Sequence, residues 1–243
     1  MVVCDVMVRT SWMGDGPPAC LGSYGRAVLV HWSAPVMTVG LDGAAVENAL
    51  GSGRLGCPRV GCGGLLARWG WARERTVRGA GRLQPRRGRC IGCLRTQVLL
   101  PASVLLRRAD GATVIGAALL AKAGGAGHRR IAGQLERPAS TVRGWLRRIV
   151  SVAERVLAVC AAAAGEVGVE FVPPAPTAEP VAAVVELIGA LARAVARRLG
   201  GSCSPWRLAA VLTGGRLITP TGPELAAAGA AGRNTNSLWA ASR

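Results

Sequence analysis

The sequence has little aromatic, lysine or acidic content. It contains one Phe and one Tyr beside seven Trp, and Lys122 is its one lysine, so arginine carries nearly all of the positive charge. Because large rings are scarce, a hydrophobic core has to be built mainly from Leu, Val and Ala. Half of the residues are nevertheless hydrophobic, which excludes a chain that is mostly disordered.

A long apolar run is missing as well. The longest stretch without Asp, Glu, Lys or Arg covers residues 27–41, which is shorter than the ~20 apolar residues that a membrane-spanning helix needs. Asp5 and Arg9 interrupt the N-terminus, so no secretory signal is expected there. These absences predict a cytoplasmic protein without membrane contact, in a compartment where disulfides are rare.

The positive charge is concentrated in the middle of the chain. Thirty cations face 13 acidic residues, for a net charge of +17, and residues 54–148 hold 20 of the cations and three of the acids. The rest of the chain is neutral, with ten of each. A localised basic segment is typical of a polyanion-binding protein; the alternative is a solvated surface in an arginine-rich protein.

Four of the eight cysteines form two pairs, which are Cys57 with Cys62 and Cys90 with Cys93. Two turns that each present two thiolates provide the four ligands of a tetrahedral Zn²⁺ site, and arginines near both pairs favour the thiolate form. We therefore expect one structural Zn²⁺. The first pair encloses four residues instead of two, so a degraded or unrelated pair is the alternative. The other cysteines are interpreted as incidental small hydrophobic residues: Cys4, Cys20, Cys160 and Cys203.

The segments around the two pairs are typical of strands. Residues 65–77 carry Trp69 and Trp71, which are expected to share one strand face, and residues 96–100 form a short strand that Pro101 stops. A turn with a cysteine pair, then strands, a second such turn and a last strand predict, in this order, a zinc ribbon over residues 43–101. A unit with so little core should need its metal to fold.

The next segment, residues 102–150, has helical periodicity. A helix through residues 114–121 ends at a glycine-rich stretch, and two short helices follow over residues 129–136 and 140–148, with Glu136 at a turn position where Gly is common. Their apolar residues predict a shared wedge, as in a helix-turn-helix unit: Ile131, Leu135, Val142, Trp145 and Leu146. An ordinary helical hairpin with solvent-facing arginines is the alternative.

The helix-turn-helix interpretation assigns nine residues to double-stranded DNA. Those expected to face the bases or their edges are Ala139, Ser140, Thr141, Arg143 and Gly144. Those expected to contact phosphates are Arg129, Arg130, Arg147 and Arg148.

Several motifs resemble one family. They include Arg-Cys-Ile-Gly-Cys at residues 89–93, Pro-Ala-Ser-Thr-Val-Arg-Gly-Trp-Leu at residues 138–146, and the segments 46–50, 99–101, 107–110, 114–123, 127–132 and 205–210. Together they resemble the actinobacterial zinc-ribbon plus helix-turn-helix proteins of uncharacterised function, which are often encoded with mobile elements and described as transposase-like. The resemblance spans about residues 45–219 and implies DNA binding. In that family the first cysteine pair is usually Cys-x-x-Cys, whereas this chain has two additional residues between Cys57 and Cys62.

Catalysis by this chain is not expected. After Arg148 the sequence has no Asp, and its glutamates lie on helical or Pro-rich sequence, whereas a DDE-type nuclease needs carboxylates that converge on two Mg²⁺ ions. The predicted function is zinc-dependent, sequence-specific DNA binding near the nucleoid, as a transposon end-recognition protein beside a separately encoded transposase or as a transcription regulator. The alternative is a zinc-ribbon interaction protein that binds RNA or an acidic protein partner.

The remaining segments complete an α+β, mostly α prediction. Residues 151–219 are expected to be helical with a Pro-rich linker at 173–180, residues 1–42 have no assigned role, and residues 220–243 are expected to be disordered. Two heptad-like seams predict either a homodimer or an intramolecular helical hairpin. The first seam is Val142, Trp145, Ile149, Val152, Val156 and Val159, and the second is Val181, Val184, Ile188, Leu191 and Val195.

Overall fold

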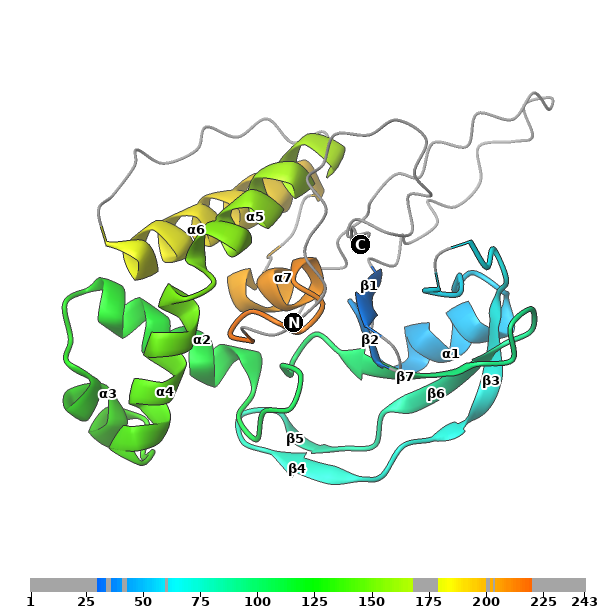
Figure 1. Cartoon of the computed structure of the whole chain (residues 1–243), viewed down its shortest axis with the longest axis horizontal. Coiled ribbons are helices and arrows are strands. Elements are labelled where there is room, and N and C mark those ends of the chain that lie inside the picture. The colour runs from blue at the N-terminus through cyan, green and yellow to red at the C-terminus, as the bar shows by residue number, and fades with distance from the viewer. Residues whose placement is uncertain are drawn as a thin grey trace.

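The computed structural model describes residues 30–33, 36–40, 43–59, 61–167, 179–199, 202 and 204–219. These residues form an α+β structure that is mostly helical, as predicted. Figure 1 shows the main sheet at one end of the molecule with one short helix (residues 43–51) on it, and most of the other helices gathered at the opposite end. The predicted tail at 220–243, most of the Pro-rich linker, and Cys4, Cys20 and Cys203 lie outside the described residues.

The main sheet has five strands in the order β1-β2-β7-β6-β3. Their bounds are β1 Val30–Ser33, β2 Val36–Val39, β3 Leu66–Trp71, β6 Arg86–Cys90 and β7 Thr96–Pro101. β2 pairs with β7 in parallel, and the other neighbours are antiparallel. Two strands from the part of the chain that had no assigned role therefore extend the sheet beyond the segment expected to form the zinc ribbon.

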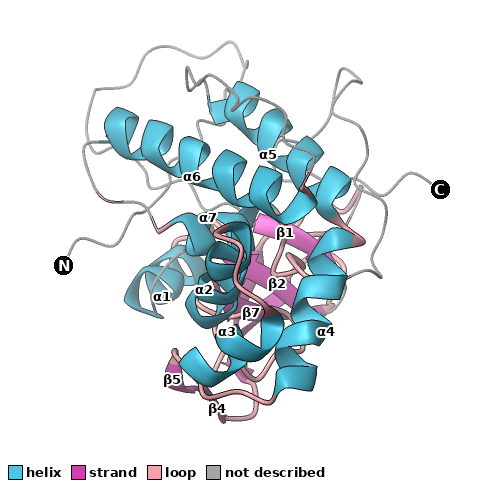
Figure 2. Cartoon of the chain, turned by 90° about the vertical axis from the view of Figure 1, so that its left-hand side faces the viewer, coloured by secondary structure: helices cyan, strands magenta, loops and turns pink. Residues whose placement is uncertain are grey.

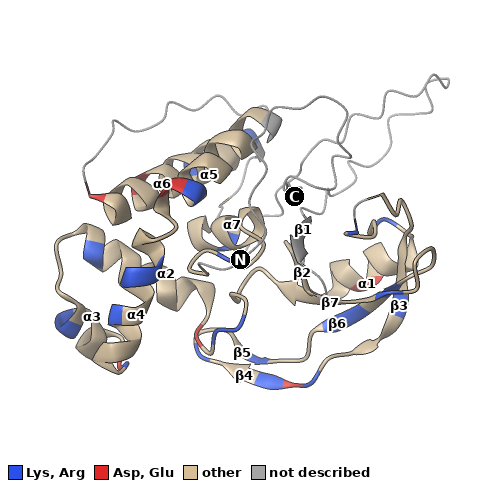
Figure 3. Cartoon of the chain, in the orientation of Figure 1, with Lys and Arg blue, Asp and Glu red and all other residues tan. Residues whose placement is uncertain are grey.

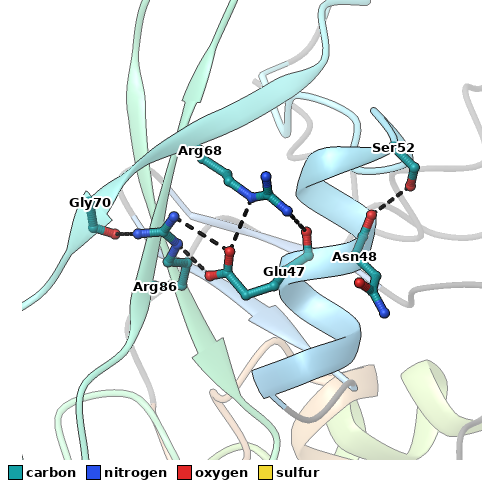
Figure 4. Close-up of polar contacts among 6 residues, drawn as sticks. All are labelled: Glu47, Asn48, Ser52, Arg68, Gly70 and Arg86. Atoms are coloured by element: carbon teal, nitrogen blue, oxygen red, sulfur yellow. Dashed lines mark hydrogen bonds and ion pairs between the residues drawn. The ribbon is translucent and has the colours of Figure 1, made fainter.

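Helix α1 (Gly43–Gly51) packs on this sheet through Val46, Ala49 and Leu50. Its Glu47 forms ion pairs with Arg68 of β3 (3.1 Å) and Arg86 of β6 (2.5 Å), as Figure 4 shows. Arg68 also donates to the Glu47 carbonyl, and Arg86 donates to the Gly70 carbonyl. One carboxylate thus joins the helix to two strands, close to the residues that lead into the cysteine turns.

A bulge in β3 changes the predicted arrangement of the two tryptophans. The pairing of β3 with β6 shifts between Arg68 and Gly70, and Trp71 then lies opposite Arg86. The guanidinium group of Arg86 stacks on the ring of Trp71, and that of Arg89 stacks on the ring of Trp69. Since Arg86 and Arg89 are three residues apart on a regularly paired strand, they point to opposite faces. The two rings therefore do not share one face, and the predicted strand over residues 65–77 is broken before β4 (Arg75–Val77), which pairs with β5 (Gly81–Leu83).

The helices pack around a separate and larger core. They are α2 (Ala112–Ala123), α3 (His128–Gln134), α4 (Ala139–Val150), α5 (Ala153–Val167), α6 (Pro180–Leu199) and α7 (Pro205–Leu212). Helix α2 packs closely on α7, since a Cβ at Gly116 would lie 2.1 Å from the ring of Trp206. Ser204 caps α7 by accepting a hydrogen bond from the backbone N–H of Arg207, and Pro205 begins the helix.

Both predicted seams are buried within one chain. All eleven side chains named for them are buried, and α5 and α6 lie side by side, as Figures 1 and 2 show. This packing is what the hairpin alternative requires. A homodimer stays a prediction, but these side chains are already covered by the chain's own helices.

The sheet and the helices are connected by backbone and side-chain contacts. The backbone of Arg78, after β4, bonds to the loop before α2 at Ala109 and Gly111. In the same loop, Asp110 pairs with Arg137 at 2.6 Å, and both side chains are largely buried. Arg137 lies in the turn between α3 and α4, so this pair fixes the helix pair to the loop that Arg78 contacts after β4. Among the described residues, no helix is both long and apolar enough to cross a membrane.

Candidate metal centre and nucleic-acid interface

The structure brings the four predicted cysteines together. Cys57 Sγ lies 3.7 Å from Cys93 Sγ, and Cys62 Sγ lies 3.6 Å from Cys90 Sγ. All four sulfurs lie within 4.8 Å of one another. With Zn–S bonds of about 2.3 Å, the sulfurs of a tetrahedral site are ~3.8 Å apart. The cluster can therefore hold one metal ion, even though the first pair encloses four residues.

Local hydrogen bonds shape the turn that carries Cys90 and Cys93. The backbone N–H groups of Gly92 and Cys93 donate to Cys90 Sγ at 3.3 and 3.4 Å. The N–H of Leu94 donates to the Cys90 carbonyl, and Leu94 adopts a left-handed φ of 59°. Because N–H groups favour the charged form of the sulfur they contact, this turn suits a thiolate ligand.

The turn that carries Cys57 and Cys62 brings its two sulfurs into the same cluster with a longer loop. Cys57 N–H donates to the Gly64 carbonyl at 2.6 Å, and Cys62 N–H donates to the Arg59 carbonyl at 3.1 Å. Gly61 and Gly63 have positive φ values of 72° and 61°, which glycine adopts without steric cost. The additional residues are thus absorbed by glycine-containing turns.

Gly64 has a role in this site that sequence reasoning missed. A Cβ at this position would lie 2.7 Å from Cys90 Sγ and 3.2 Å from the backbone nitrogen of Gly92. Glycine is therefore required for the two turns to approach each other. The signal in the sequence was the pair of glycines that directly follows Cys62.

The thiols differ in how readily they lose a proton. Burial raises the pKa of Cys57, whereas the backbone N–H of Arg95 lowers the pKa of Cys93 to about 6. The expected influence of nearby arginines is not among the causes of either shift. Arg86 is paired with Glu47, and Arg89 donates to the Leu94 carbonyl and stacks on Trp69. Hydrogen bonds and burial, instead of arginine charges, set these pKa shifts.

Helices α3 and α4 are joined by a tight turn with a left-handed residue. Glu136 has a φ of 52°, which is strained for a residue other than glycine, and it occupies the position singled out from the sequence. Its N–H donates to the Gly133 carbonyl, and the N–H of Arg137 donates to the Ala132 carbonyl. Helix α4 begins directly afterwards, with the Thr141 and Val142 N–H groups donating to the Pro138 carbonyl.

The apolar sides of the two helices form the predicted wedge. The side chains buried in the core are Ile131, Val142, Trp145 and Leu146, and Leu135 packs against them partly buried. The opposite side of each helix faces outward. Because α4 is amphipathic in this way, its polar residues are held at the surface in a fixed orientation.

All nine residues predicted to contact DNA lie at the surface of this helix pair. The exposed ones are Arg129, Arg130, Ala139, Ser140, Arg143 and Arg147, and the half-buried ones are Thr141, Gly144 and Arg148. Figure 3 shows the basic positions on α3 and α4, away from the main sheet. Arg148 lies along α4, since a Cβ at Gly144 would meet its Nη1 at 3.1 Å.

Comparisons of the chain with protein-family models, with curated proteins and with solved structures find no match. A function for the chain therefore has to rest on the chemistry of the cysteine cluster and of the α3–α4 surface.

Proposed function

We propose that this chain is a zinc-dependent, sequence-specific double-stranded DNA-binding protein. In this proposal the segment of residues 43–101 acts as a zinc ribbon, and α2, α3 and α4 act as a helix-turn-helix unit with α4 as its recognition helix. The observation that carries the proposal is the outward face of α4, where small residues and arginines are held at the surface by a fully packed inner face.

The residue types on that face suit a major groove. Ala139, Ser140 and Gly144 are small, so a helix that carries them can approach base edges closely. Arg143 is exposed on the same face and has the fork geometry for guanine O6 and N7. Arg129 and Arg130 lie in the first turn of α3, and exposed arginines of this kind commonly contact the phosphate backbone.

The local electrostatics also favour a polyanion. Residues 54–148 carry a large excess of arginine over acidic residues, and the ion pairs seen in the described part of this segment involve Arg68, Arg82, Arg86 and Arg137. None of the arginines predicted to contact DNA takes part in these ion pairs. The charge of these arginines therefore remains available to phosphates.

Zinc is the metal that we assign to the cysteine cluster. Four thiolates in a tetrahedron are the usual ligand set of structural Zn²⁺, and they leave no open position for substrate. The ion would supply folding free energy to the sheet region and no chemistry, so the chain is proposed to bind DNA without catalysis. A transposon end-recognition role beside a separately encoded transposase, or transcription regulation at the nucleoid, fits such an activity.

Selection of a preferred duplex from a random library tests the proposal. With the selected duplex, Arg143→Ala should cost roughly 1–3 kcal/mol and relax specificity at one base pair. Arg147→Ala should weaken all duplexes alike and reduce the salt slope by about one. Arg197→Ala, at an exposed position of α6, is the matched control and should bind as the parent does. If no duplex is enriched, or if Arg143→Ala binds as tightly as the control, the recognition-helix assignment is wrong.

A second candidate is single-stranded RNA binding by the sheet region. Trp69 and Trp71 are 54% and 53% exposed although each is stacked on an arginine. Exposed rings beside arginines are suited to stacking on unpaired bases. Competition between single-stranded RNA and duplex DNA separates the two functions, because Trp69→Ala should weaken only RNA binding, and Arg143→Ala only duplex binding.

A further inference from the structure

Five arginines from distant parts of the chain meet beside the end of α4. Arg107 and Arg108 lie in the loop between β7 and α2, Arg148 is near the end of α4, Arg155 is in the first turn of α5, and Arg216 follows α7. Burial and the charge of Arg148 lower the pKa of Arg108. Burial and the charges of Arg155 and Arg107 lower the pKa of Arg216. We call these five residues the arginine junction.

Hydrogen bonds place the junction around one short segment. Arg108 Nη2 donates to the Ile218 carbonyl at 3.1 Å, and Arg155 Nη2 donates to the next carbonyl, that of Thr219, at 2.5 Å. The N–H of Leu106 donates to the Gly215 carbonyl at 2.8 Å. The two guanidinium groups are therefore held at adjacent residues by elements that are far apart in the sequence.

Two polar atoms at this place lack a hydrogen-bond partner among the described residues. They are Arg108 Nε and the Thr219 hydroxyl oxygen, and both atoms are buried. A buried donor without a partner destabilises the fold, and more so when it is charged. In the described part of the chain, Arg107, Arg108, Arg148 and Arg155 also form no ion pair with a carboxylate. The junction thus holds concentrated positive charge and unsatisfied donors.

We propose that the arginine junction is a binding site for a phosphate-type oxyanion. Such a group presents several acceptor oxygens, which can satisfy the Arg108 Nε and Thr219 hydroxyl donors and offset the mutual repulsion of the guanidinium groups. The same chemistry is available from free phosphate and from a phosphodiester of DNA, which α4 would bring close to Arg148. The site itself does not depend on the proposed DNA-binding function.

Thermal unfolding with inorganic phosphate tests the site directly. Phosphate at about ten times its Kd should raise the Tm of the metal-loaded full chain by roughly 3–6 °C above a chloride control of equal ionic strength. Arg107→Gln should abolish this shift, because Arg107 is exposed and can lose its charge without loss of packing. Arg197→Gln removes the same charge from α6 and should retain the shift. No shift for the parent, or an equal loss in both variants, would overturn the proposal.

Duplex binding then separates the two sources of phosphate. If Arg107→Gln also lowers the salt slope of duplex binding by about one relative to Arg197→Gln, the site takes a phosphodiester. If the slope is unchanged while the phosphate shift is lost, the site takes a free oxyanion. A parent chain that is stabilised by phosphate but binds no duplex would refute the proposed function and leave this site supported.

Discussion

The sheet region (residues 30–101) and the helical region (residues 102–219) are stabilised by different means. In the sheet region the main core is small and includes two of the candidate metal ligands, Cys57 and Cys90. In the helical region a much larger set of Leu, Ile, Val and Ala side chains packs from α2 through α7. Buried apolar area is the main driving force of folding, so from this comparison we expect the sheet region to depend on a bound metal and the helical region to be stable through packing.

Metal removal should give the largest difference between the two regions. Structural zinc sites contribute apparent binding free energies of about 10–16 kcal/mol. Chelation, or Cys90→Ser, is therefore expected to abolish amide-exchange protection in residues 55–101 while α2–α6 stay protected. Metal analysis should fall from one equivalent to well below one. Cys160→Ala removes a buried thiol of α5 and should keep the metal; equal metal content in both variants would refute the cysteine site.

Breaking a buried ion pair of the helical region, beside the loop that contacts the sheet region, should have the next largest effect. Arg137→Leu leaves Asp110 buried without its partner, which is expected to lower the free energy of unfolding by about 3 kcal/mol. Urea denaturation measures this change. Arg82→Leu is the matched control, because its ion pair with Glu74 is exposed and should contribute at most about 1 kcal/mol. Similar losses in both variants would show that the buried pair contributes no more to stability than the exposed one.

A methyl group at Gly116 should disturb only the helical region. Its Cβ would overlap the Trp206 ring at 2.1 Å, and overpacking of this kind costs typically about 1–3 kcal/mol. Gly116→Ala should therefore lower stability to urea while the metal content stays at one equivalent. Combining it with Trp206→Leu should give a loss smaller than the sum of the two single changes. Additive losses would contradict the contact between α2 and α7.

A methyl group at Gly64 is the corresponding change in the sheet region, with the smallest expected effect. It would meet Cys90 Sγ and the backbone of Gly92, so metal affinity should fall about tenfold or more, as when supporting groups of a metal site are changed. Competition with a chromogenic chelator measures the affinity. Gly165→Ala, in open space on α5, should leave it unchanged. Unchanged affinity in Gly64→Ala would show that the two turns do not need this close approach.

Patterns within short segments predicted a substantial part of this structure. The paired cysteines identified the candidate metal site, because ligand chemistry and spacing are local. Helices α2, α3 and α4 were found close to their observed bounds, since apolar periodicity over a few turns determines which face is buried. Glu136 was identified as the unusual turn residue and does have a left-handed φ.

Other features could not be obtained from such patterns. The seams from Val142 to Val159 and from Val181 to Val195 were visible, but their spacing is the same whether the partner helix belongs to the same chain or to another. The strand pattern likewise predicted that Trp69 and Trp71 share one face. This prediction was wrong because a bulge between paired strands leaves no periodic signal in the sequence. In both cases the partner, and not the segment, decides the outcome.

The sequence by itself determined the four candidate cysteine ligands, the amphipathic helix pair and the basic middle segment, because each depends on patterns of residues that are close in the chain. Only the tertiary structure decided that β2 pairs in parallel with β7, that Gly64 and Gly116 are points of close approach, and that Arg108 reaches the carbonyl of Ile218. These contacts join segments far apart in the sequence. Their geometry follows from how whole elements pack, which no local pattern records.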